Sequence, residues 1–377
     1  MQFHDFDIDA FLRDAWQKQP RLIRNPWRNW VNPIEPDELA GLACDDEIES
    51  RLIVCAGDTW SLEHGPLSEA RFAELGDGTW TLLVQAVDHA VPAVAELIAP
   101  FRFVPNWRID DVMVSYASDG GGVGPHFDQY DVFLVQGLGR RRWRVGPRCD
   151  AATPLRPHDA LRLIEDFAPV QEWVLEPGDI LYVPPGFAHD GVAIGSDCMT
   201  YSIGFRAPSR AELIEDWCED VVDRLDEDDR YVDRGRTRQD NCGEIAAADV
   251  DRLHAMVTER MLDRDAFARW FGRHASTRKY PDLDWQPDAP LSVSRARAVI
   301  AAEAVLRRNP ASRFAFIRKG DGTLLLFADG SEFPCQGADA RFAERLCAEE
   351  ALPLGGDAVT ADLLVRLYNQ GSVTIER

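Results

Sequence analysis

The chain has 377 residues, is 45% hydrophobic and carries a formal net charge of −23 at pH 7. This length is enough for two or three hydrophobic cores, while the absence of an 18-residue apolar run argues against a membrane span. The acidic first residues lack the basic head and apolar body of a signal peptide, so a cytoplasmic protein is expected. The negative charge disfavours direct binding to nucleic acid and favours basic partners, although solubility alone also accounts for it.

The cysteines support the same compartment. Eight of them are scattered along the chain, and no Cys-x-x-Cys pair occurs. This pattern indicates reduced thiols that fill cores, and neither a disulfide framework nor a zinc site.

Residues 1–99 predict a mixed helical and strand segment that buttresses the following barrel. The spacing of Phe11, Leu12, Ala15 and Trp16 predicts a helix, and Pro36 followed by two acids is typical of a helix start. Further elements are expected at Arg51–Val54 and Trp80–Val87 (strands) and at Pro92–Phe101 (a short helix). Trp16, Trp27 and Trp30 are interpreted as packing residues.

Residues 100–207 contain the chemistry. The strand Asp111–Ala117 leads into the glycine-rich run Gly120–Gly124, which is followed by His126 and Asp128 at the head of an apolar strand. Residues two apart on a strand point to the same side, so both side chains can bind one metal ion. The glycines allow the backbone to approach that ion closely. They do not form a phosphate-binding loop, because the Gly-Lys-Ser/Thr ending is missing and no helix is expected after them.

A second histidine, His189, follows a Pro-Pro-Gly break after the apolar strand that begins at Ile180. Two histidines and one carboxylate on one side of an ion form the facial triad of non-haem Fe(II) oxygenases. The sequence therefore predicts a metal site made of His126, Asp128 and His189.

A hairpin is expected next, with strands Val132–Gln136 and Arg140–Val145 joined at Gly137-Leu-Gly139. Alternation groups Arg141 with Trp143 and Val145 on the core side of the return strand. A buried arginine is costly unless an anion meets it. The anion is either a buried aspartate in a structural ion pair or the carboxylate of a substrate or cosubstrate. After the hairpin, a short helix is expected near Pro157–Leu163, and a closing strand at Cys198–Phe205.

These motifs resemble the JmjC-type 2-oxoglutarate oxygenases of the cupin superfamily. Within them the chain most resembles the bacterial ribosomal oxygenases that hydroxylate an arginine of large-subunit ribosomal protein sixteen. The resemblance is carried by the Gly120–Val135 run, Gly-Arg-Arg-Arg-Trp-Arg-Val-Gly, Pro-Gly-Asp-Ile-Leu-Tyr-Val-Pro-Pro-Gly, Trp107–Asp111 and Ser202–Pro208. It covers nearly the whole chain and weakens after about residue 280.

The resemblance implies an α+β fold built on a double-stranded β-helix, the jelly-roll barrel of cupins, with N-terminal helices. It implies Fe(II) as the metal, with 2-oxoglutarate and O2 as cosubstrates and succinate and CO2 as products. Arg141 is then expected to receive the far carboxylate of 2-oxoglutarate, with Ser115 and Thr200 as further residues of the cosubstrate site. The expected target is the β-carbon of an arginine, and Asp119, Asp131 and Asp190 are candidate acids at the substrate mouth.

Residues 208–280 predict a helical region. Ser209 and Glu212 form a capping box, and Leu213, Trp217, Val221 and Leu225 recur every four residues on the helix that follows. A second helical stretch is expected from Ala246 to Phe271. The two can pack on the barrel or on a second subunit, and the resemblance implies a homodimer formed through this region.

Residues 281–377 predict a winged-helix-like domain. A helix near Ser294–Arg308 is expected before strands Phe314–Arg318 and Thr323–Phe327, two more helices and a last strand Ser372–Ile375. In so acidic a chain, a packing or docking role is favoured over DNA binding.

Three other functions remain open at the level of sequence. The barrel could be a cupin oxygenase that needs no 2-oxoglutarate, a JmjC hydroxylase of another basic protein, or a catalytically silent ribosome-associated binding module. Inward Arg141 argues against the first, and the complete ligand set argues against the last.

Overall fold

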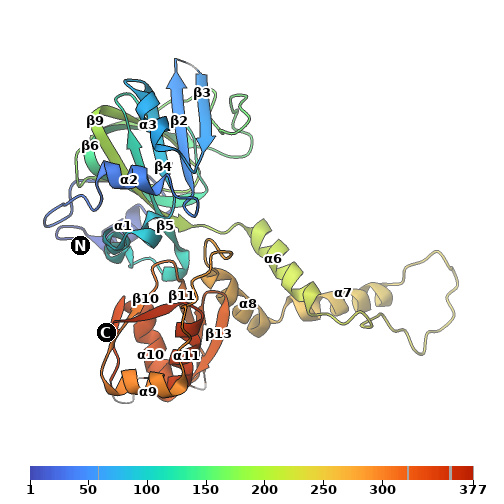
Figure 1. Cartoon of the computed structure of the whole chain (residues 1–377). Helices are drawn as coiled ribbons and strands as arrows, with labels where there is room; N and C mark the ends of the chain where they lie inside the picture. Colours follow the sequence, from blue (N-terminus) through green and yellow to red (C-terminus); the bar gives the residue numbers. More distant parts are fainter. Residues whose placement is uncertain (58, 321, 356–358, 377) are drawn as a thin grey trace. The chain divides into compact units, whose positions relative to one another are not determined.

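The computed structural model describes the chain apart from residues 58, 321, 356–358 and 377. It divides into two compact units. The first contains Met1–Ala207 with Lys279–Trp285 and Arg308–Ala311; the second contains Pro208–Arg278, Gln286–Arg307 and Ser312–Arg377. Figure 1 shows the elements of both units. No helix in the described part of the chain is long and apolar enough to cross a membrane.

The first unit is built on one antiparallel sheet of nine strands. Its order is β1 (Arg21–Ile23), β8 (Ile180–Val183), β6 (Tyr130–Arg148), β9 (Phe187–Arg206), β5 (Ile109–Ala117), β4 (Thr79–Val84), β2 (Ser50–Ala56) and β3 (Thr59–His64), with β7 (Gln171–Leu175) paired to β6. The first half of β6 pairs with β8, the second half pairs with β7, and β9 follows it along both halves. These long bent strands wind the sheet into the jelly roll that was expected.

The expected hairpin at Gly137-Leu-Gly139 is wrong. β6 runs through this point as one strand, and its register against β9 shifts on both sides of Leu138. The glycines allow this bulge because Gly139 has a φ of 58° and a Cβ there would lie 2.7 Å from the carbonyl oxygen of Asp197. The bulge also changes which positions face inward, so Leu134 before it and Arg141 after it line the same cavity.

Short helices surround this sheet. They are α1 (Ile8–Asp14), α2 (Pro36–Leu42), α3 (Glu69–Leu75), α4 (Val87–Ala90), α5 (Pro92–Ala95) and the 3₁₀ helices η1 (Glu96–Phe101) and η2 (Asn106–Arg108). The helices expected near residues 9 and 36 are confirmed. The strand expected to reach Val87 ends at Val84, since Ala86 adopts a left-handed conformation and α4 begins after it.

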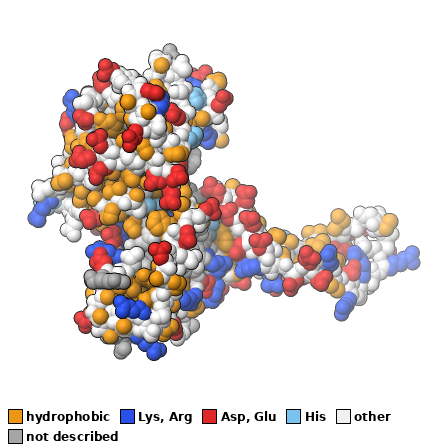
Figure 2. Space-filling model, in the orientation of Figure 1, with side chains coloured by type: hydrophobic (Ala, Val, Ile, Leu, Met, Phe, Trp, Pro, Cys, Tyr) orange, Lys and Arg blue, Asp and Glu red, His pale blue; other side chains and the backbone are white. Residues whose placement is uncertain are grey.

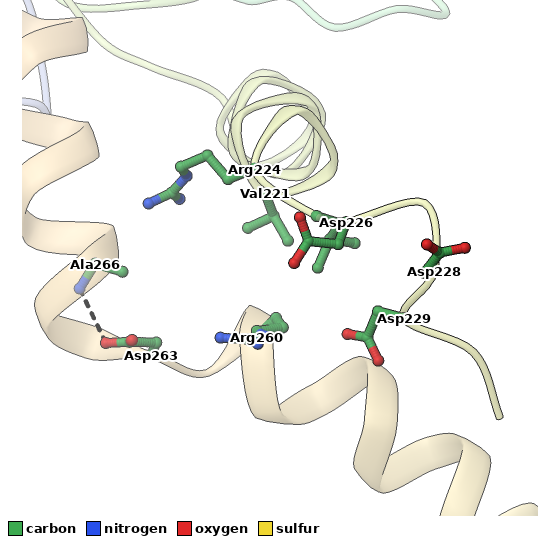
Figure 3. Close-up of a pocket in the computed structure, with 9 residues that line it drawn as sticks. Val221, Arg224, Asp226, Asp228, Asp229, Arg260, Asp263 and Ala266 are labelled. Carbon is green, nitrogen blue, oxygen red and sulfur yellow. Dashed lines mark hydrogen bonds between the residues drawn. The ribbon is translucent and has the colours of Figure 1, made fainter. Parts of the chain in front are cut away.

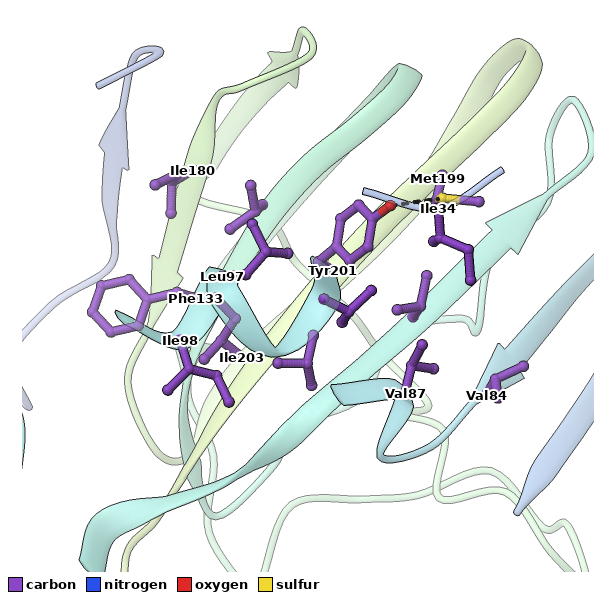
Figure 4. Packing of buried hydrophobic residues seen from close by; sticks show 14 of the residues in the cluster. Ile34, Val84, Val87, Leu97, Ile98, Phe133, Ile180, Met199, Tyr201 and Ile203 are labelled. Carbon is purple, nitrogen blue, oxygen red and sulfur yellow. Dashed lines mark hydrogen bonds between the residues drawn. The ribbon is translucent and has the colours of Figure 1, made fainter. Parts of the chain in front are cut away.

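The main core of the unit lies between the sheet and these helices. Phe133, Tyr201 and Ile203 are fully buried there with Leu97 of η1, and Figure 4 shows their packing. The packing role of the tryptophans is confirmed: the ring of Trp16, for example, stacks on that of Tyr182 with centroids 5.5 Å apart. This aromatic core fixes the strands that carry the site.

The helix expected near Pro157–Leu163 is wrong. This segment is an irregular loop in which Leu155 and Ile164 form an isolated bridge. His158 accepts hydrogen bonds through Nδ1 from the backbone N–H groups of Ala160 and Leu161. Such a local side-chain bond competes with helix formation, which explains the difference.

The second unit begins with α6 (Arg210–Asp223), α7 (Ala247–Met261) and α8 (Arg264–Ser276). The capping box between Ser209 and Glu212 is confirmed. Trp217 is 4% exposed and packs on Trp270 of α8, with ring centroids 5.4 Å apart. Trp217 and Val221 of the apolar stripe are therefore covered by the same chain, whereas Leu225, beyond the end of α6, is 42% exposed. The acidic side chains of α6 stand at the surface (Figure 2).

The rest of this unit is a winged-helix-like domain. It contains α9 (Val293–Ala301), α10 (Gly337–Ala348) and α11 (Ala361–Asn369), a sheet of β14 (Ala351–Pro353), β10 (Val305–Arg308) and β15 (Val373–Glu376), and a sheet of β11 (Phe314–Arg318), β12 (Leu324–Ala328) and β13 (Ser331–Cys335). The helix expected to reach Arg308 ends at Ala301, and β13 was not expected. All eight cysteines are free, as expected, but only Cys198, Cys335 and Cys347 are buried, so most of them do not fill a core.

Candidate metal centre and cosubstrate pocket

Three potential metal ligands converge in the jelly roll. His126, Asp128 and His189 each offer one ligand atom, and these atoms lie within 4.8 Å of one another. The Asp128 Oδ2 atom is 3.6 Å from Nε2 of His126 and 3.8 Å from Nε2 of His189. This is the set that the sequence predicts, and it fits a metal ion that needs two imidazoles and one carboxylate on one face.

Backbone hydrogen bonds hold the two histidines side by side. The N–H of His126 donates to the carbonyl of His189 at 3.0 Å, and the N–H of His189 donates to the carbonyl of His126 at 2.8 Å. The glycine-rich lead-in is needed close to this point, because a Cβ on Gly122 would lie 2.4 Å from the carbonyl oxygen of Gly191. The loop therefore reaches the site only without side chains.

The hydrogen bonds of the rings also select the right nitrogen for a metal. Nδ1 of His126 lies 2.8 Å from the carbonyl oxygen of Gly124, and Nδ1 of His189 lies 2.9 Å from that of Phe187. A carbonyl only accepts, so each Nδ1 carries a proton, and Nε2 is the ring atom that can bind a metal when the ring is neutral. Such outer partners orient metal-bound histidines in proteins.

The electrostatics of His189 and Asp128 favour the forms that bind a metal, whereas at His126 burial is outweighed by the neighbouring carboxylate of Asp128, which raises the pKa of His126. Burial, together with the charge of His126, lowers the pKa of His189 to about 4, so its ring is neutral at physiological pH. Desolvation opposes ionisation of Asp128, but the charge and hydrogen bond of His126 outweigh it and hold the pKa of Asp128 below its ordinary value. The site thus presents a carboxylate and a neutral imidazole.

Arg141 lies inside the jelly roll, as alternation predicts. It is 2% exposed and lines the same cavity as the three ligands. Its Nε atom donates to Sγ of Cys198 at 3.4 Å, while Nη2 is buried without a hydrogen-bond partner among the described residues. No ion pair of the described residues includes Arg141, so the structural ion pair is not present. An unsatisfied buried guanidinium N–H fits an incoming carboxylate.

The two other residues expected at the cosubstrate site face this cavity as well. Ser115 on β5 and Thr200 on β9 are directly paired across the sheet and are 2% and 1% exposed. The hydroxyl of Thr200 donates to Oε1 of Gln136 at 3.2 Å, and that of Ser115 lies 3.4 Å from the carbonyl of Thr200. Both hydroxyls lie on the wall of the cavity that also contains Arg141.

The cavity has a volume of about 390 Å³ and a charged second part. Its lining there includes Glu49, Arg51, Asp110, Asp111 and Lys279. Sequence reasoning missed these residues. A signal existed for Asp111, because it precedes Ser115 by four positions on β5 and alternation places both on one face.

The acids suggested for the substrate mouth are not there. The backbone N–H of Gly195 donates to Asp119, Arg108 and Tyr182 donate to Asp131, and Arg144 pairs with Asp190. None of these three aspartates lines the cavity. Nearness to the ligands along the chain was a poor guide, because Asp131 and Asp190 are satisfied by arginines elsewhere in the fold.

The fold and the ligand set define a JmjC-type oxygenase. The JmjC domain family matches residues 96–213, and the ROXA-like winged helix family matches residues 258–374.

The relatives narrow this class. Ribosomal protein uL16 3-hydroxylase of Escherichia coli (strain K12) is 42% identical over 280 residues, which cover 74% of each chain. The X-ray structure of E. coli ycfD aligns over all of both chains with a TM-score of 0.89 at 34% identity. A structure of YcfD, described as a ribosomal oxygenase in complex with cobalt and 2-oxoglutarate, aligns over 100% of this chain and 99% of that one with a TM-score of 0.86 at 36% identity. The chain belongs to the family of JmjC-domain ribosomal oxygenases.

Proposed function

We propose that this chain is an Fe(II)- and 2-oxoglutarate-dependent oxygenase that hydroxylates the β-carbon of an arginine in large-subunit ribosomal protein uL16, with release of succinate and CO2. One observation carries the proposal. The three metal ligands and the unsatisfied guanidinium of Arg141 line a single cavity of about 390 Å³. The uL16 substrate follows from the name of the E. coli relative.

The residues that line the cavity have separate roles in the proposed hydroxylation. His126, Asp128 and His189 would hold Fe(II) through two imidazoles and one carboxylate. The bound metal and 2-oxoglutarate supply the oxidising chemistry. Arg141 binds the far carboxylate of 2-oxoglutarate, and the hydroxyls of Ser115 and Thr200 complete that end of the pocket. Trp143, whose ring lies 5.9 Å from that of His189, packs beside the site and helps to exclude water.

The charged part of the cavity suits a cationic side chain. Gln85 and the backbone N–H of Ala86 donate to Oδ2 of Asp111 at 2.6 and 2.8 Å. No hydrogen bond from the described residues reaches its other oxygen, Oδ1, which lies beside Gly204 of the cavity wall. A guanidinium placed there has a carboxylate to bind, and the same cavity offers the apolar side chain of Met113 to its aliphatic stem.

The test is the intact mass of uL16 after incubation with the protein, Fe(II), 2-oxoglutarate and O2, beside a His126→Ala control. The expected result is a gain of one oxygen with the parent protein only, mapped to one arginine. Succinate without modified uL16 would keep the oxygenase and discard the substrate. Neither product would favour a docking role for the jelly roll.

We also propose that the protein is a homodimer joined through α7. None of the 15 residues of this helix is buried. Val250, Leu253 and Val257 form an exposed apolar stripe along it. A lone helix with such a stripe is not stable in water, and a second copy that presents the same stripe would cover it. We also propose that the enzyme works in the cytoplasm, where a ribosomal substrate is found.

A further inference from the structure

Lys279 contributes a positive charge to the charged part of the catalytic cavity. It belongs to the segment Lys279–Trp285, which lies far from the jelly-roll strands in the sequence but packs in the same unit. Its side chain is 19% exposed, and its Nζ atom lies 2.9 Å from Oδ2 of Asp110 and 3.1 Å from Oδ2 of Asp111. One ammonium group thus bridges two neighbouring carboxylates in the cavity wall.

The choice of lysine at this position is informative. The chain has only three lysines, Lys18, Lys279 and Lys319, and uses arginine at its other basic positions. An ammonium is a compact charge on a flexible four-carbon stem, whereas a guanidinium binds a carboxylate through a planar fork of N–H groups. A lysine can therefore neutralise Asp110 and Asp111 before a ligand binds, and its flexible stem lets it move away more easily than an arginine would.

The charged residues that line this part of the cavity also support a counter-ion role for Lys279. The charged part of the cavity is lined by three acids, Glu49, Asp110 and Asp111, and by two bases, Arg51 and Lys279. Without Lys279, two adjacent carboxylates that are 11% and 5% exposed would lose their shared counter-ion. Loss of this counter-ion from the nearly buried Asp111 is costly, and an incoming cation would relieve that cost.

We propose that Lys279 is a built-in counter-ion that competes with the substrate guanidinium for Asp110 and Asp111, and so weakens the binding of the arginine and of its hydroxylated product. The inference rests on the proposed function, because it takes an arginine side chain as the ligand. The ammonium of Lys279 at Oδ2 and the guanidinium at Oδ1 then repel each other across the carboxylate of Asp111.

The experiment is a binding titration of full-length protein with a fluorescent uL16 peptide that contains the target arginine in its unmodified form. It is done with 2-oxoglutarate under anaerobic conditions, so that no turnover occurs. Lys279→Met is expected to lower the Kd of this peptide roughly three- to tenfold, because one repelling charge has been removed. The same peptide with neutral citrulline in place of arginine should bind the parent and the variant equally.

Lys18→Met is the matched control, since Lys18 is exposed on the surface of the same unit, and it should leave both Kd values unchanged. Lys279→Gln, which can still donate to Asp110, repeats the test if the Met variant does not fold. An unchanged or larger Kd for the arginine peptide in the Lys279 variants would overturn the inference, and so would an equal change for both peptides. Intact mass of uL16 with the parent protein decides the proposed function separately, because it does not depend on Lys279.

Discussion

Two cavities of similar volume differ in almost every other respect. The catalytic cavity in the jelly roll measures about 390 Å³, and a cavity in the helical region measures about 490 Å³. The second is lined by Asp226, Asp228, Asp229 and Asp263 with Arg224 and Arg260, as Figure 3 shows. These charged side chains are all exposed, and Asp263 is already used to cap α8 by accepting from the N–H of Ala266.

The catalytic cavity instead contains a buried charge that is left unsatisfied. Arg141 is 2% exposed and has a donor without a partner among the described residues, and three ligand atoms meet within 4.8 Å nearby. A cluster of exposed acids is an ordinary solvated surface, whereas a buried polar group without a partner has a cost that a ligand can repay. The convergence of ligand atoms and the burial of an unsatisfied polar group therefore identify the functional site better than the volume or the charge of a cavity does.

The largest expected effect is that of Asp128→Ala in the catalytic cavity, with Asp226→Ala in the exposed cavity as its comparison. Asp128→Ala should lower uL16 hydroxylation by more than about 100-fold, because the loss of a direct ligand exceeds the effect of losing an outer partner. Asp226→Ala should leave the rate unchanged. The measurement is the rate of oxygen gain by intact mass, with the affinity for Fe(II) measured alongside. Full activity of Asp128→Ala would contradict the assignment of the metal site.

The second prediction compares the 2-oxoglutarate requirement of variants at two neighbouring arginines on β6. Arg141→Ala should raise the 2-oxoglutarate concentration needed for half-maximal turnover roughly 10- to 100-fold, the contribution of hydrogen bonds between charged groups. Arg142→Ala should change it less than about threefold, because Arg142 does not line the cavity. Succinate formation at a series of 2-oxoglutarate concentrations measures both. Equal shifts would mean that Arg141 does not bind the cosubstrate.

Sequence alone predicted the part of this cavity that depends on short-range pattern. The spacing of His126 and Asp128, the alternation that turns Arg141 inward, and the resemblance of the motifs to ribosomal oxygenases all led to a fold and a family that are confirmed. The inward position of Arg141 was predicted although the hairpin was not correct. Alternation within Arg140–Val145 holds whether a turn or a bulge precedes it.

The rest of the cavity depends on contacts that no local pattern encodes. Lys279 meets Asp110 across 169 positions of the chain, and Glu49 and Arg51 come from the N-terminal segment, which was expected only to buttress the jelly roll. Glycines permit both a hairpin turn and a bulge, so Gly137-Leu-Gly139 could not be assigned from its composition. The sequence predicted the apolar stripe that contains Trp217, but the spacing of its residues does not reveal which element covers it. In the structure, α8 of the same chain covers Trp217.

The third prediction concerns the helical region, where the exposed surface and not the cavity is expected to matter. Val257→Glu should raise the dimer dissociation constant by about 30-fold or more, since it places a charge in the apolar stripe at its most exposed position. Ala255→Glu, on the opposite side of α7, should leave it unchanged. Sedimentation equilibrium over a range of concentrations measures the constant. A parent protein that is monomeric at all concentrations would end the dimer proposal.

The smallest effect tests whether the buried acids next to the catalytic cavity reduce stability. Asp88 is 3% exposed, and burial together with the charge of Asp111 raises the pKa of Asp88 to about 8. The folded protein therefore keeps a proton on Asp88 that the unfolded chain releases near its ordinary pKa of 3.8. Because the folded state binds more protons between these values, stability is greatest at the acid end and falls as the pH rises toward 8.

Asp88→Asn should remove this fall, because an amide keeps an oxygen that can accept from the N–H of Val112 and has no proton to lose. The variant should gain stability relative to the parent on going from pH 6 to pH 8, by an amount of the order of 1 kcal/mol per pH unit. Urea denaturation at the two pH values measures the difference, and Asp226→Asn in the exposed cavity is the control that should show none. A constant difference between Asp88→Asn and the parent at both pH values would mean that Asp88 is ionised in the folded protein.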